Sequence, residues 1–341
     1  MKRPSKINYP ARIKLARLPT PLVKMDRLSQ KLGVEIYFKR DDMTGSELSG
    51  NKIRKLEFIF AEAESQGADT IITCGGAQSN HCRATALAAT AAGFDSVLLL
   101  RAADPGNPPP VQGNILLDHL AGAQIIWITP EEYKQRDERF QKEAARLRSA
   151  GCKPYIIPEG GSCALGAWGY VAAMDELASD LAALDGGKIL PTTVIAATGS
   201  GGTTAGLLLG TRLLDLDIRI AGINVCDDHD YFMEVITAIC SDFYKKYFPK
   251  EKIDPASGIE IVDGYVGRGY ALSRPEELRA IRDLARLEGV ILDPVYTGKA
   301  FFGMLSELEK NPHAFGPRIV FVHTGGLFGL FPIADQLVAD L

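Results

Sequence analysis

The stretch Ser49–Glu57 (SGNKIRKLE) is the part of the sequence from which the rest of the chain is best interpreted. Gly50 frees the backbone, Lys52 follows it closely, and apolar residues then recur at helical spacing until Gly67. This spacing predicts a helix with Lys52 in its first turn. Unpaired N–H groups and the helix dipole disfavour an ammonium group there and lower its pKa. A lysine made neutral in this way can form a Schiff base with a carbonyl compound, although most lysines are simply solvated surface residues.

Composition sets the broad class of the protein. The chain has 341 residues, of which 46% are hydrophobic and 23% charged, as in a soluble protein with one large or two ordinary domains. The net charge is −4 without a basic run, so nucleic acid is an unfavoured partner. Met1–Pro4 leads into no apolar segment and no membrane-spanning stretch follows, so we expect neither secretion nor membrane insertion. Six scattered cysteines and five histidines indicate reduced cytoplasmic thiols and no metal site.

Strand and helix patterns alternate along most of the chain. The predicted strands are 35–39, 69–74, 96–101, 124–128, 155–157, 193–197, 218–225, 259–262, 290–292 and 319–323. The predicted helices are 22–32, 79–92, 113–121, 131–149, 164–184, 231–247, 275–287 and 297–309, with a further helix that ends at 214 and a short C-terminal one. This order is typical of mostly parallel sheets with helices on both faces, and the number of strands favours two such sheets in contact.

A glycine-rich loop, Gly199–Thr204 (GSGGTT), follows a buried strand and precedes a helix. Small residues there let backbone N–H groups and the helix N-terminus surround a phosphate. The loop is no Walker A motif, because no Lys-Ser/Thr pair follows at the required spacing. It nearly matches the dinucleotide pattern G-x-G-x-x-G, and Asp227 and Asp228 after the next strand are candidates for the ribose-binding acid. A nicotinamide enzyme and a purely structural turn both stay open on this motif alone.

Three further turns carry polar residues at strand ends. Ser79 and Asn80 lie in GGAQSNH at 75–81, where as isolated residues they are best interpreted as helix N-caps. The same amides and side chains also suit a carboxylate or a phenolate oxygen. The other two turns are DPVYTGK at 293–299 and HTGG at 323–326. Since open α/β sheets bind ligands at the carboxyl ends of their strands, a phosphate loop, a helix-start lysine and an anion turn together predict pyridoxal phosphate plus an amino acid.

Six motifs, in order and along nearly the whole chain, resemble the D-cysteine desulfhydrase and 1-aminocyclopropane-1-carboxylate deaminase family. They are SGNKIRKLEF, GGAQSNH, IPEGGSCALGAWGY, ATGSGGTTAGL, LDPVYTGKA and VHTGG. The family consists of fold-type-II pyridoxal phosphate enzymes, similar to tryptophan synthase β. The resemblance implies two open, twisted, mostly parallel sheets covered by helices. It also implies a large pyridoxal-phosphate-binding domain at 1–55 and 169–341, a small domain at 56–168, and a homodimer.

The resemblance also implies roles for individual residues. Lys52 would hold the cofactor covalently, with Lys55 and Lys299 as the alternatives, and Asn80 would bind its phenolic oxygen. The other cofactor-binding residues would be Gly199, Ser200, Gly201, Gly202, Thr203, Thr297 and Thr324. Substrate would contact Asn51, Gln78, Ser79, Tyr270 and Tyr296. The catalytic residues would be Lys52, Ser79, Tyr270 and Tyr296, although an isolated tyrosine is more often a packing residue.

Two positions separate the branches of the family. The cyclopropane deaminases carry Glu after the DPVY tyrosine and Leu before the final Gly-Gly, whereas this chain has Thr297 and Thr324, as the D-cysteine enzymes do. A neutral hydroxyl does not keep the pyridine nitrogen protonated, and eliminating a thiolate needs less electron withdrawal than opening an unactivated ring. CDDHDYF at 226–232 also resembles plant desulfhydrases, which removes the ribose-binding interpretation of Asp227 and Asp228.

The sequence thus favours pyridoxal-phosphate-dependent elimination of D-cysteine to pyruvate, hydrogen sulfide and ammonia. The alternative is a 1-aminocyclopropane-1-carboxylate deaminase that gives 2-oxobutanoate and ammonia. Other β-substituted D-amino acids and L-cysteate stay open as substrates. A nicotinamide-dependent dehydrogenase and a non-catalytic descendant of the fold are the alternatives from other classes.

Overall fold

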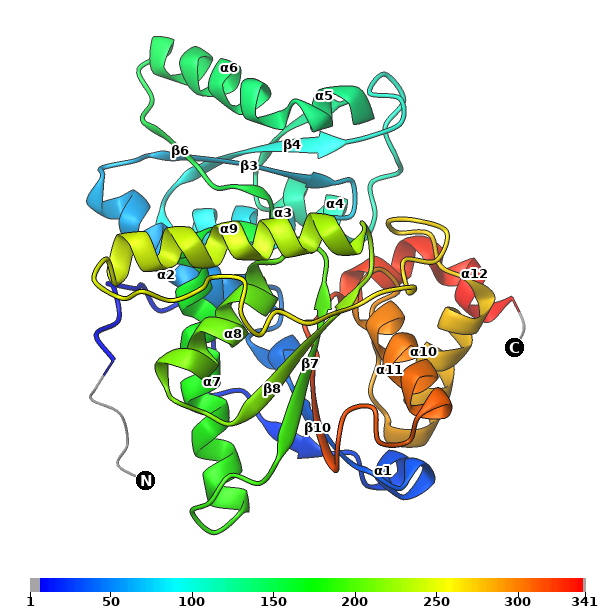
Figure 1. The fold of residues 1–341 in the computed structure, drawn as a ribbon. Coiled ribbons are helices and arrows are strands. Elements are labelled where there is room, and N and C mark those ends of the chain that lie inside the picture. The colour runs from blue at the N-terminus through cyan, green and yellow to red at the C-terminus, as the bar shows by residue number, and fades with distance from the viewer. Residues whose placement is uncertain (1–6, 340–341) are drawn as a thin grey trace.

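The computed structural model describes residues 7–339, so the sequence-based expectation for Met1–Pro4 lies outside the described residues. The chain forms two mostly parallel β-sheets covered by helices, which confirms the predicted fold class (Figure 1). The six-stranded sheet has the order β1 (Leu22–Lys24), β2 (Glu35–Lys39), β10 (Arg318–Val322), β7 (Thr192–Thr198), β8 (Ile218–Asn224) and β9 (Ile261–Val262). The four-stranded sheet has the order β5 (Gln124–Ile128), β4 (Asp95–Arg101), β3 (Thr70–Gly76) and β6 (Pro154–Ile156).

Helices connect the strands of both sheets. Their bounds are α1 (Asp26–Leu32), α2 (Lys52–Ser65), α3 (Asn80–Ala92), α4 (Asn114–Leu120), α5 (Pro130–Lys134), α6 (Arg136–Ser149), α7 (Ala164–Leu184), α8 (Gly202–Leu213), α9 (His229–Tyr247), α10 (Pro275–Glu288), α11 (Thr297–Lys310) and α12 (Ala334–Val338). Short 3₁₀ segments are η1 (Asp41–Met43), η2 (Glu159–Gly161) and η3 (Leu327–Ile333). The domain boundaries at 55/56 and 168/169 stay a prediction.

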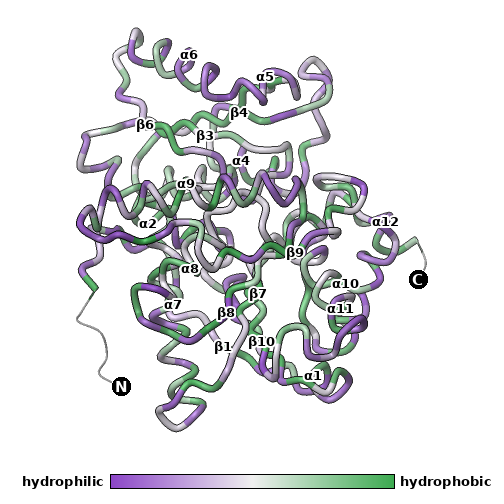
Figure 2. The backbone as a smooth tube through the Cα atoms, in the orientation of Figure 1, coloured by the Kyte–Doolittle hydropathy of each residue, from purple (hydrophilic) through white to green (hydrophobic). Residues whose placement is uncertain are grey.

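The largest hydrophobic core lies between the two sheets. It is built from residues of α2, α3, α7, α8 and α9, with Phe60, Trp168 and Phe243 among its largest buried side chains. A second core packs α1, α10 and α11 against the outer face of the six-stranded sheet. In Figure 2 most strands are coloured as hydrophobic, whereas α6 and α9 carry both hydrophobic and hydrophilic residues. Parallel strands that are buried on both faces need such continuous apolar runs.

Three sequence-based predictions are wrong in detail. Residues 22–32 are not one helix, because Leu22–Lys24 pair antiparallel with β2 before α1 begins. Residues 131–149 form two helices, α5 and α6, since the backbone leaves the helical conformation at Gln135. Residues 290–292 form no strand: Val290 and Leu292 are buried in the second core and Ile291 is exposed, but their backbone joins neither sheet. For residues 22–24 a long-range contact, which local patterns do not report, decides the outcome.

The order of the six-stranded sheet brings distant loops together. Strands β2, β10 and β7 are adjacent and parallel, with Val322 opposite Lys39 and Phe321 opposite Ile195. Their carboxyl ends therefore lie at one edge, and the segments that leave them carry Lys52, Thr324 and the glycine-rich loop. This edge faces the four-stranded sheet, where β3 leads into Asn80. Topology thus gathers the polar turns of the sequence in one place.

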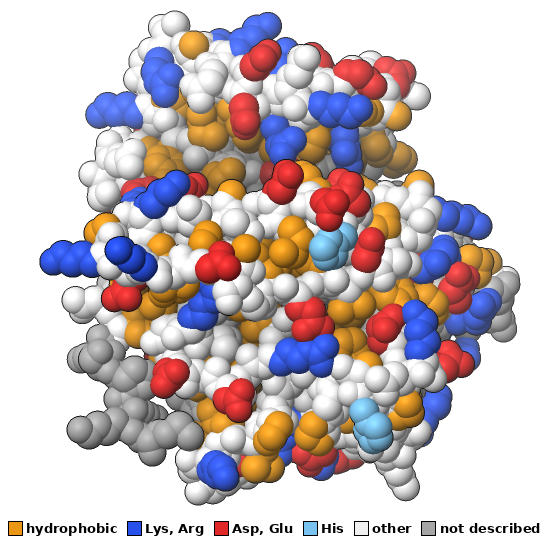
Figure 3. Space-filling view, in the orientation of Figure 1, with side chains coloured by type: hydrophobic (Ala, Val, Ile, Leu, Met, Phe, Trp, Pro, Cys, Tyr) orange, Lys and Arg blue, Asp and Glu red, His pale blue; other side chains and the backbone are white. Residues whose placement is uncertain are grey.

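The surface carries charges of both signs. Figure 3 shows acidic and basic side chains interspersed over one face, and hydrophobic side chains in the hollow beneath the part of the chain that carries α5 and α6. Within residues 7–339, every helix is too short or too polar to cross a bilayer.

Candidate active site

A pocket lies at the carboxyl ends of β2, β10 and β7. Its lining residues are Asn51, Lys52, Asn80, Ala197, Gly199, Ser200, Gly201, Thr203, Thr204, Tyr296 and Thr324. Nine of the sequence-predicted site residues, among them Lys52, Asn80 and members of the glycine-rich loop, are therefore brought together. Gln78, Ser79, Gly202, Tyr270 and Thr297 do not line the pocket itself.

Lys52 is the first residue of α2, as predicted. The preceding residue positions it, because Asn51 donates its backbone N–H to the Thr324 carbonyl (3.1 Å) and its side-chain amide to the Thr203 hydroxyl (3.0 Å). Burial lowers the pKa of Lys52 to about 8, although the carboxylates of Glu159 and Asp293 act in the opposite direction. The sequence attributed this shift to the helix end, whereas in the structure exclusion of water is the main cause.

Two glycines, Gly50 and Gly325, pack closely against each other next to the start of α2. Gly50 has a φ of +112°, and a side chain there would meet the Thr324 carbonyl oxygen at 2.8 Å. Gly325 has a φ of +84° and lies against the Gly50 backbone. Only residues without a Cβ fit this contact, so the loop before Lys52 and the turn after β10 can pack directly on one another.

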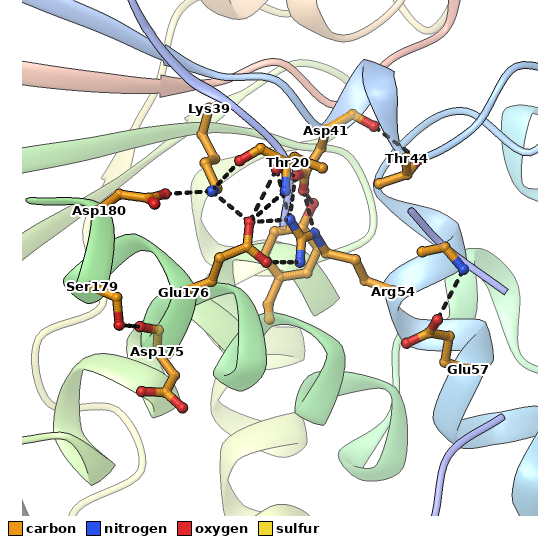
Figure 4. A network of polar contacts seen from close by, with 12 residues as sticks. Thr20, Lys39, Asp41, Thr44, Arg54, Glu57, Asp175, Glu176, Ser179 and Asp180 are labelled. Atoms are coloured by element: carbon orange, nitrogen blue, oxygen red, sulfur yellow. Dashed lines mark hydrogen bonds and ion pairs between the residues drawn. The ribbon is translucent and has the colours of Figure 1, made fainter. Parts of the chain in front are cut away.

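A cluster of buried ion pairs fixes α2 from its other side (Figure 4). We call the group of Lys39, Asp41, Arg54, Glu176 and Asp180 the ion-pair cluster. Arg54 binds Asp41 through two hydrogen bonds (2.7 and 2.9 Å) and Glu176 at 3.0 Å, while Lys39 lies 2.5 Å from Glu176 and 2.7 Å from Asp180. Because the cluster joins β2, η1, α2 and α7, it holds the helix that carries Lys52 in a fixed place.

The glycine-rich loop presents donors to the pocket. Gly201 has a φ of +74° and precedes the first turn of α8, whose first N–H groups lack partners within the helix. The Ser200 hydroxyl lies 2.9 Å from that of Ser162, which also accepts the Gly202 N–H at 3.3 Å. Ser162 thus supports the loop from behind. A helix start of this kind suits a phosphate group.

Lys55 lies behind the same loop and is fully buried. Its Nζ donates to the Gly160 carbonyl at 3.2 Å, and a Cβ at Gly202 would lie 2.9 Å from it. Burial holds the pKa of Lys55 well below its usual value, and the neighbouring charge of Lys52 lowers it further. The sequence analysis named this residue only as an alternative to Lys52. The signal was present, because Lys52 and Lys55 are three residues apart on one helix face.

Asn80 and the residues before it occupy the start of α3. Asn80 accepts a hydrogen bond from the Asn114 amide (2.9 Å) and lines the pocket. Ser79 is the N-cap of α3 and accepts the Cys82 N–H at 3.1 Å, which confirms the capping interpretation. Gln78 uses its side-chain amide to hold the chain at Gln112 and Asn114, with distances of 2.9 and 2.8 Å. No sequence motif indicated Asn114.

The two predicted tyrosines form a hydrogen-bonded pair. Their hydroxyl oxygens are 2.9 Å apart, and Tyr296 reaches the pocket whereas Tyr270 lies behind it. Burial raises the pKa of Tyr270 to about 12, and burial together with Tyr270 raises that of Tyr296 well above its usual value. Both phenols therefore carry their proton near neutral pH and are placed to donate hydrogen bonds.

The two threonines differ in position. Thr324 lines the pocket, whereas Thr297 is buried and its hydroxyl lies 2.6 Å from an Asp293 oxygen. The same carboxylate accepts the backbone N–H groups of Val295, Tyr296 and Thr297. Asp293 therefore caps the start of α11. Asp227 and Asp228 do not line the pocket, and Asp228 caps α9 by accepting the Tyr231 N–H at 2.8 Å.

These residues fit pyridoxal phosphate. The pocket offers one amine of lowered pKa, a helix start for a phosphate, and the amide of Asn80 for a ring oxygen. Within residues 7–339, neither Lys55 nor the Asn80 Nδ2 atom has an acidic partner, so both are available to an anionic ligand. Buried polar groups without partners are costly unless a ligand supplies them.

Comparisons with known proteins agree with this assignment. The family described as pyridoxal-phosphate dependent enzyme matches residues 13–325. The bifunctional D-cysteine desulfhydrase/1-aminocyclopropane-1-carboxylate deaminase, mitochondrial, of Arabidopsis thaliana is 41% identical over 334 residues, covering 95% of this chain and 80% of that protein. The D-cysteine desulfhydrase of Yersinia pestis is 39% identical over 333 residues, covering 96% and 97%. A solved structure of an ACC deaminase homologue has a TM-score of 0.87 at 36% identity, covering 98% of this chain and 97% of that chain.

Proposed function

Because the chain belongs to the pyridoxal-phosphate dependent enzyme family, we propose that it is a carbon–sulfur lyase that converts D-cysteine and water to pyruvate, hydrogen sulfide and ammonia. Its cofactor is pyridoxal 5′-phosphate, as the sequence predicted. One observation carries the choice of reaction. Within residues 7–339, no Asp or Glu is among the residues that line the pocket. Without a carboxylate beside it, the ring nitrogen of a bound cofactor would not be held in its protonated form.

The cofactor would be held by residues from four segments. Lys52 would hold its aldehyde, and the free N–H groups in the loop Gly199–Thr203 would hold its phosphate, with Lys55 supplying a hydrogen bond from behind. Asn80 would bind the ring oxygen, and Thr324, which lines the same pocket, would contact the cofactor as well. When bound, pyridoxal phosphate supplies an electron-withdrawing ring that makes the Cα proton of an amino acid acidic.

Lys52 is the base that removes the Cα proton. Its pKa of about 8 gives a useful fraction of neutral amine near neutral pH. Ser79 stands at the start of α3 next to Gln78, and Asn51 lines the pocket. This helix start binds the substrate carboxylate, with Asn51 and Gln78 as further contacts. The carboxylate and the amine together fix the direction of the Cα–H bond toward Lys52.

The tyrosine pair acts on the leaving group. As the Cα–H electron pair forms the new Cα=Cβ bond, the Cβ–S bond breaks and its electrons leave with sulfur. Tyr296 protonates the thiolate and recovers a proton from Tyr270 across the 2.9 Å hydrogen bond. The enamine product is released and is hydrolysed by water to pyruvate and ammonia. A good leaving group makes this elimination feasible with modest electron withdrawal.

A substrate panel tests the proposal. Purified holoenzyme is incubated with D-cysteine, L-cysteine and 1-aminocyclopropane-1-carboxylate, and sulfide, pyruvate, 2-oxobutanoate and ammonia are measured together. We expect equal amounts of sulfide, pyruvate and ammonia from D-cysteine. The Lys52→Ala protein with added cofactor corrects for release of sulfide by free pyridoxal phosphate. Sulfide formation at the level of this control would refute the proposal.

The second candidate is 1-aminocyclopropane-1-carboxylate deaminase. It is favoured by the Arabidopsis protein, whose name includes both activities, and by the solved ACC deaminase homologue. This candidate would be selected if the protein forms 2-oxobutanoate and ammonia from 1-aminocyclopropane-1-carboxylate and releases no sulfide from D-cysteine. Formation of both sets of products would mean that one pocket serves both substrates.

The proposal includes a cytoplasmic homodimer. Large apolar side chains on the surface, such as Phe331 with 60% of its area exposed, are suited to a contact between two copies. The six cysteines are free thiols, as expected in a reducing compartment. Sedimentation equilibrium tests the assembly, and a mass equal to that of one chain over the micromolar range would contradict it.

A further inference from the structure

A hydrogen-bonded chain of side chains runs behind the pocket from α4 to α3. Asn114, the first residue of α4, is buried and donates its amide to the Asn80 side-chain oxygen (2.9 Å) and the Gln78 carbonyl (3.0 Å). Its own side-chain oxygen accepts the Nε–H of Arg83 at 3.2 Å. Every polar atom of the Asn114 amide therefore has a partner.

These partners leave only one orientation for each amide. Arg83 has no acceptor atom, so it must face the oxygen of Asn114, and the Gln78 carbonyl can only accept, so it must face the nitrogen. The remaining N–H of Asn114 then points at Asn80, which must present its oxygen. The Asn80 NH₂ group is consequently turned the other way. Within residues 7–339 no acceptor lies within hydrogen-bonding distance of that nitrogen, and Asn80 lines the pocket.

Arg83 is itself held firmly. Its guanidinium donates to the Glu47 carbonyl (2.5 Å) and the Ser49 carbonyl (2.9 Å), in the loop that leads to Lys52. It also lies over the Phe328 ring, with 5.2 Å between the guanidinium carbon and the ring centroid. One buried cation thus positions both the loop before α2 and the amide of Asn114, so the two cofactor contacts at Lys52 and Asn80 share a support.

We propose that Asn114 is a positioning residue, fixed by Arg83, which orients the Asn80 amide so that the pocket offers a donor rather than an acceptor. This inference rests on the proposed function, in which the ligand atom facing Asn80 is the ring oxygen of the cofactor. A donor stabilises that oxygen in its ionised form. An acceptor in the same place would repel it. Asn114 therefore controls the ionisation of the bound cofactor without touching it.

The Asn114→Asp variant tests this inference because it keeps the size of the side chain and its contact with Arg83. The new carboxylate has no N–H, so Asn80 rotates to donate to it and turns its own oxygen to the pocket. We expect the pH at which the visible absorbance of the bound cofactor changes to rise by about one unit or more, and cofactor affinity to fall about tenfold or more. A titration identical to that of the wild type would overturn the inference.

A double-mutant cycle separates positioning from a general structural effect. In the Asn80→Ala background, Asn114→Asp is expected to shift the titration by less than about 0.3 unit, since the residue it acts through is gone. An undiminished shift in that background would contradict the inference. His119→Asn, an exposed change on α4, is the control and should titrate as the wild type. If the wild-type protein itself takes up no cofactor, the proposed function fails instead.

Discussion

Two buried polar groups on opposite sides of α2 show how this protein separates stability from function. On one side, the ion-pair cluster surrounds Arg54 and Lys39 with three carboxylates at distances of 2.5–3.0 Å. On the other side, Lys52 and Lys55 are held where no carboxylate of the described residues 7–339 forms an ion pair with either amine. Arg54, Lys52 and Lys55 all lie in the first turn of the same helix.

The pKa shifts express this difference. Burial opposes ionisation of Asp41, but the charge and hydrogen bonds of Arg54 outweigh it and keep the pKa of that carboxyl below its usual value. Burial of Lys52 and Lys55 is not compensated in this way, so the pKa of each amine falls. Paired buried charges serve the fold, whereas unpaired buried amines are available for a ligand and for chemistry.

The largest expected effect is that of removing Lys52. We expect Lys52→Ala to lower turnover at least about 10³-fold and to abolish covalent attachment of the cofactor, because both base and attachment point are lost. Borohydride reduction followed by peptide mapping of the wild type should find the label on Lys52. Label on Lys55 or Lys299 would contradict the assignment. Lys246→Ala, an exposed lysine on α9, is the control and should leave turnover unchanged.

Substitutions in the ion-pair cluster should lower the free energy of unfolding. We expect Asp41→Ala to lower the free energy of unfolding of the cofactor-free protein by about 3–5 kcal/mol, because Arg54 would stay buried with half of its partners removed. Urea unfolding measures this change. The adjacent Asp42→Ala removes a more exposed ion pair with Arg40 and should cost only about 0–1 kcal/mol. Equal losses in the two variants would mean that the cluster has no special role.

In contrast to a change at Asp41, a change at Lys55 should lower cofactor affinity without lowering stability. We expect Lys55→Met to lower the affinity for pyridoxal phosphate about 10–100-fold, since a charge-assisted hydrogen bond to the phosphate is lost. Stability of the cofactor-free protein should be unchanged or higher, because an uncompensated buried amine is replaced by an apolar chain of similar length. Spectrophotometric titration measures the affinity for pyridoxal phosphate, and urea unfolding measures the stability of the cofactor-free protein. Lower stability with unchanged affinity would place Lys55 among the structural residues.

The smallest expected effect is a pH dependence. The rate at which cofactor-free protein takes up pyridoxal phosphate should rise about tenfold per pH unit and level off above a pH of about 8, because the neutral form of Lys52 reacts. A rise in rate that continues toward the usual lysine pKa of 10.5 would contradict the lowered value.

The same shift of the Lys52 pKa also gives the direction in which stability changes with pH. At pH values between about 8 and 10.5, Lys52 is protonated in the unfolded chain but not in the folded protein. The contribution of Lys52 to the free energy of unfolding therefore rises with pH in this range.

Local sequence patterns predicted the elements well wherever neighbouring residues decide the conformation. Strand β5 (Gln124–Ile128) and helix α7 (Ala164–Leu184) have the predicted bounds. The start of α2 at Lys52 and the cap at Ser79 were also predicted, because helix starts depend on residues within one turn. Residues 22–24 were assigned wrongly, since only pairing with β2 makes them a strand.

The site was predicted less completely than the fold. The sequence indicated the lysine, the glycine-rich loop and Asn80, and these line one pocket. It gave no sign that Asn114 would orient Asn80, because the two residues are 34 positions apart and Asn114 belongs to no motif. Thr297 was expected at the cofactor, but its hydroxyl is held by Asp293 behind the pocket.

By itself, the sequence determined which residues begin helices and which turns suit a phosphate or an amine, because backbone geometry and capping are local. Only the tertiary structure decided which buried charges have partners. Arg54 reaches Glu176 across 122 positions of the chain, and Lys55 reaches only a carbonyl 105 positions away. Burial and pairing set the pKa of a side chain, and both depend on what the fold brings within a few ångströms of it.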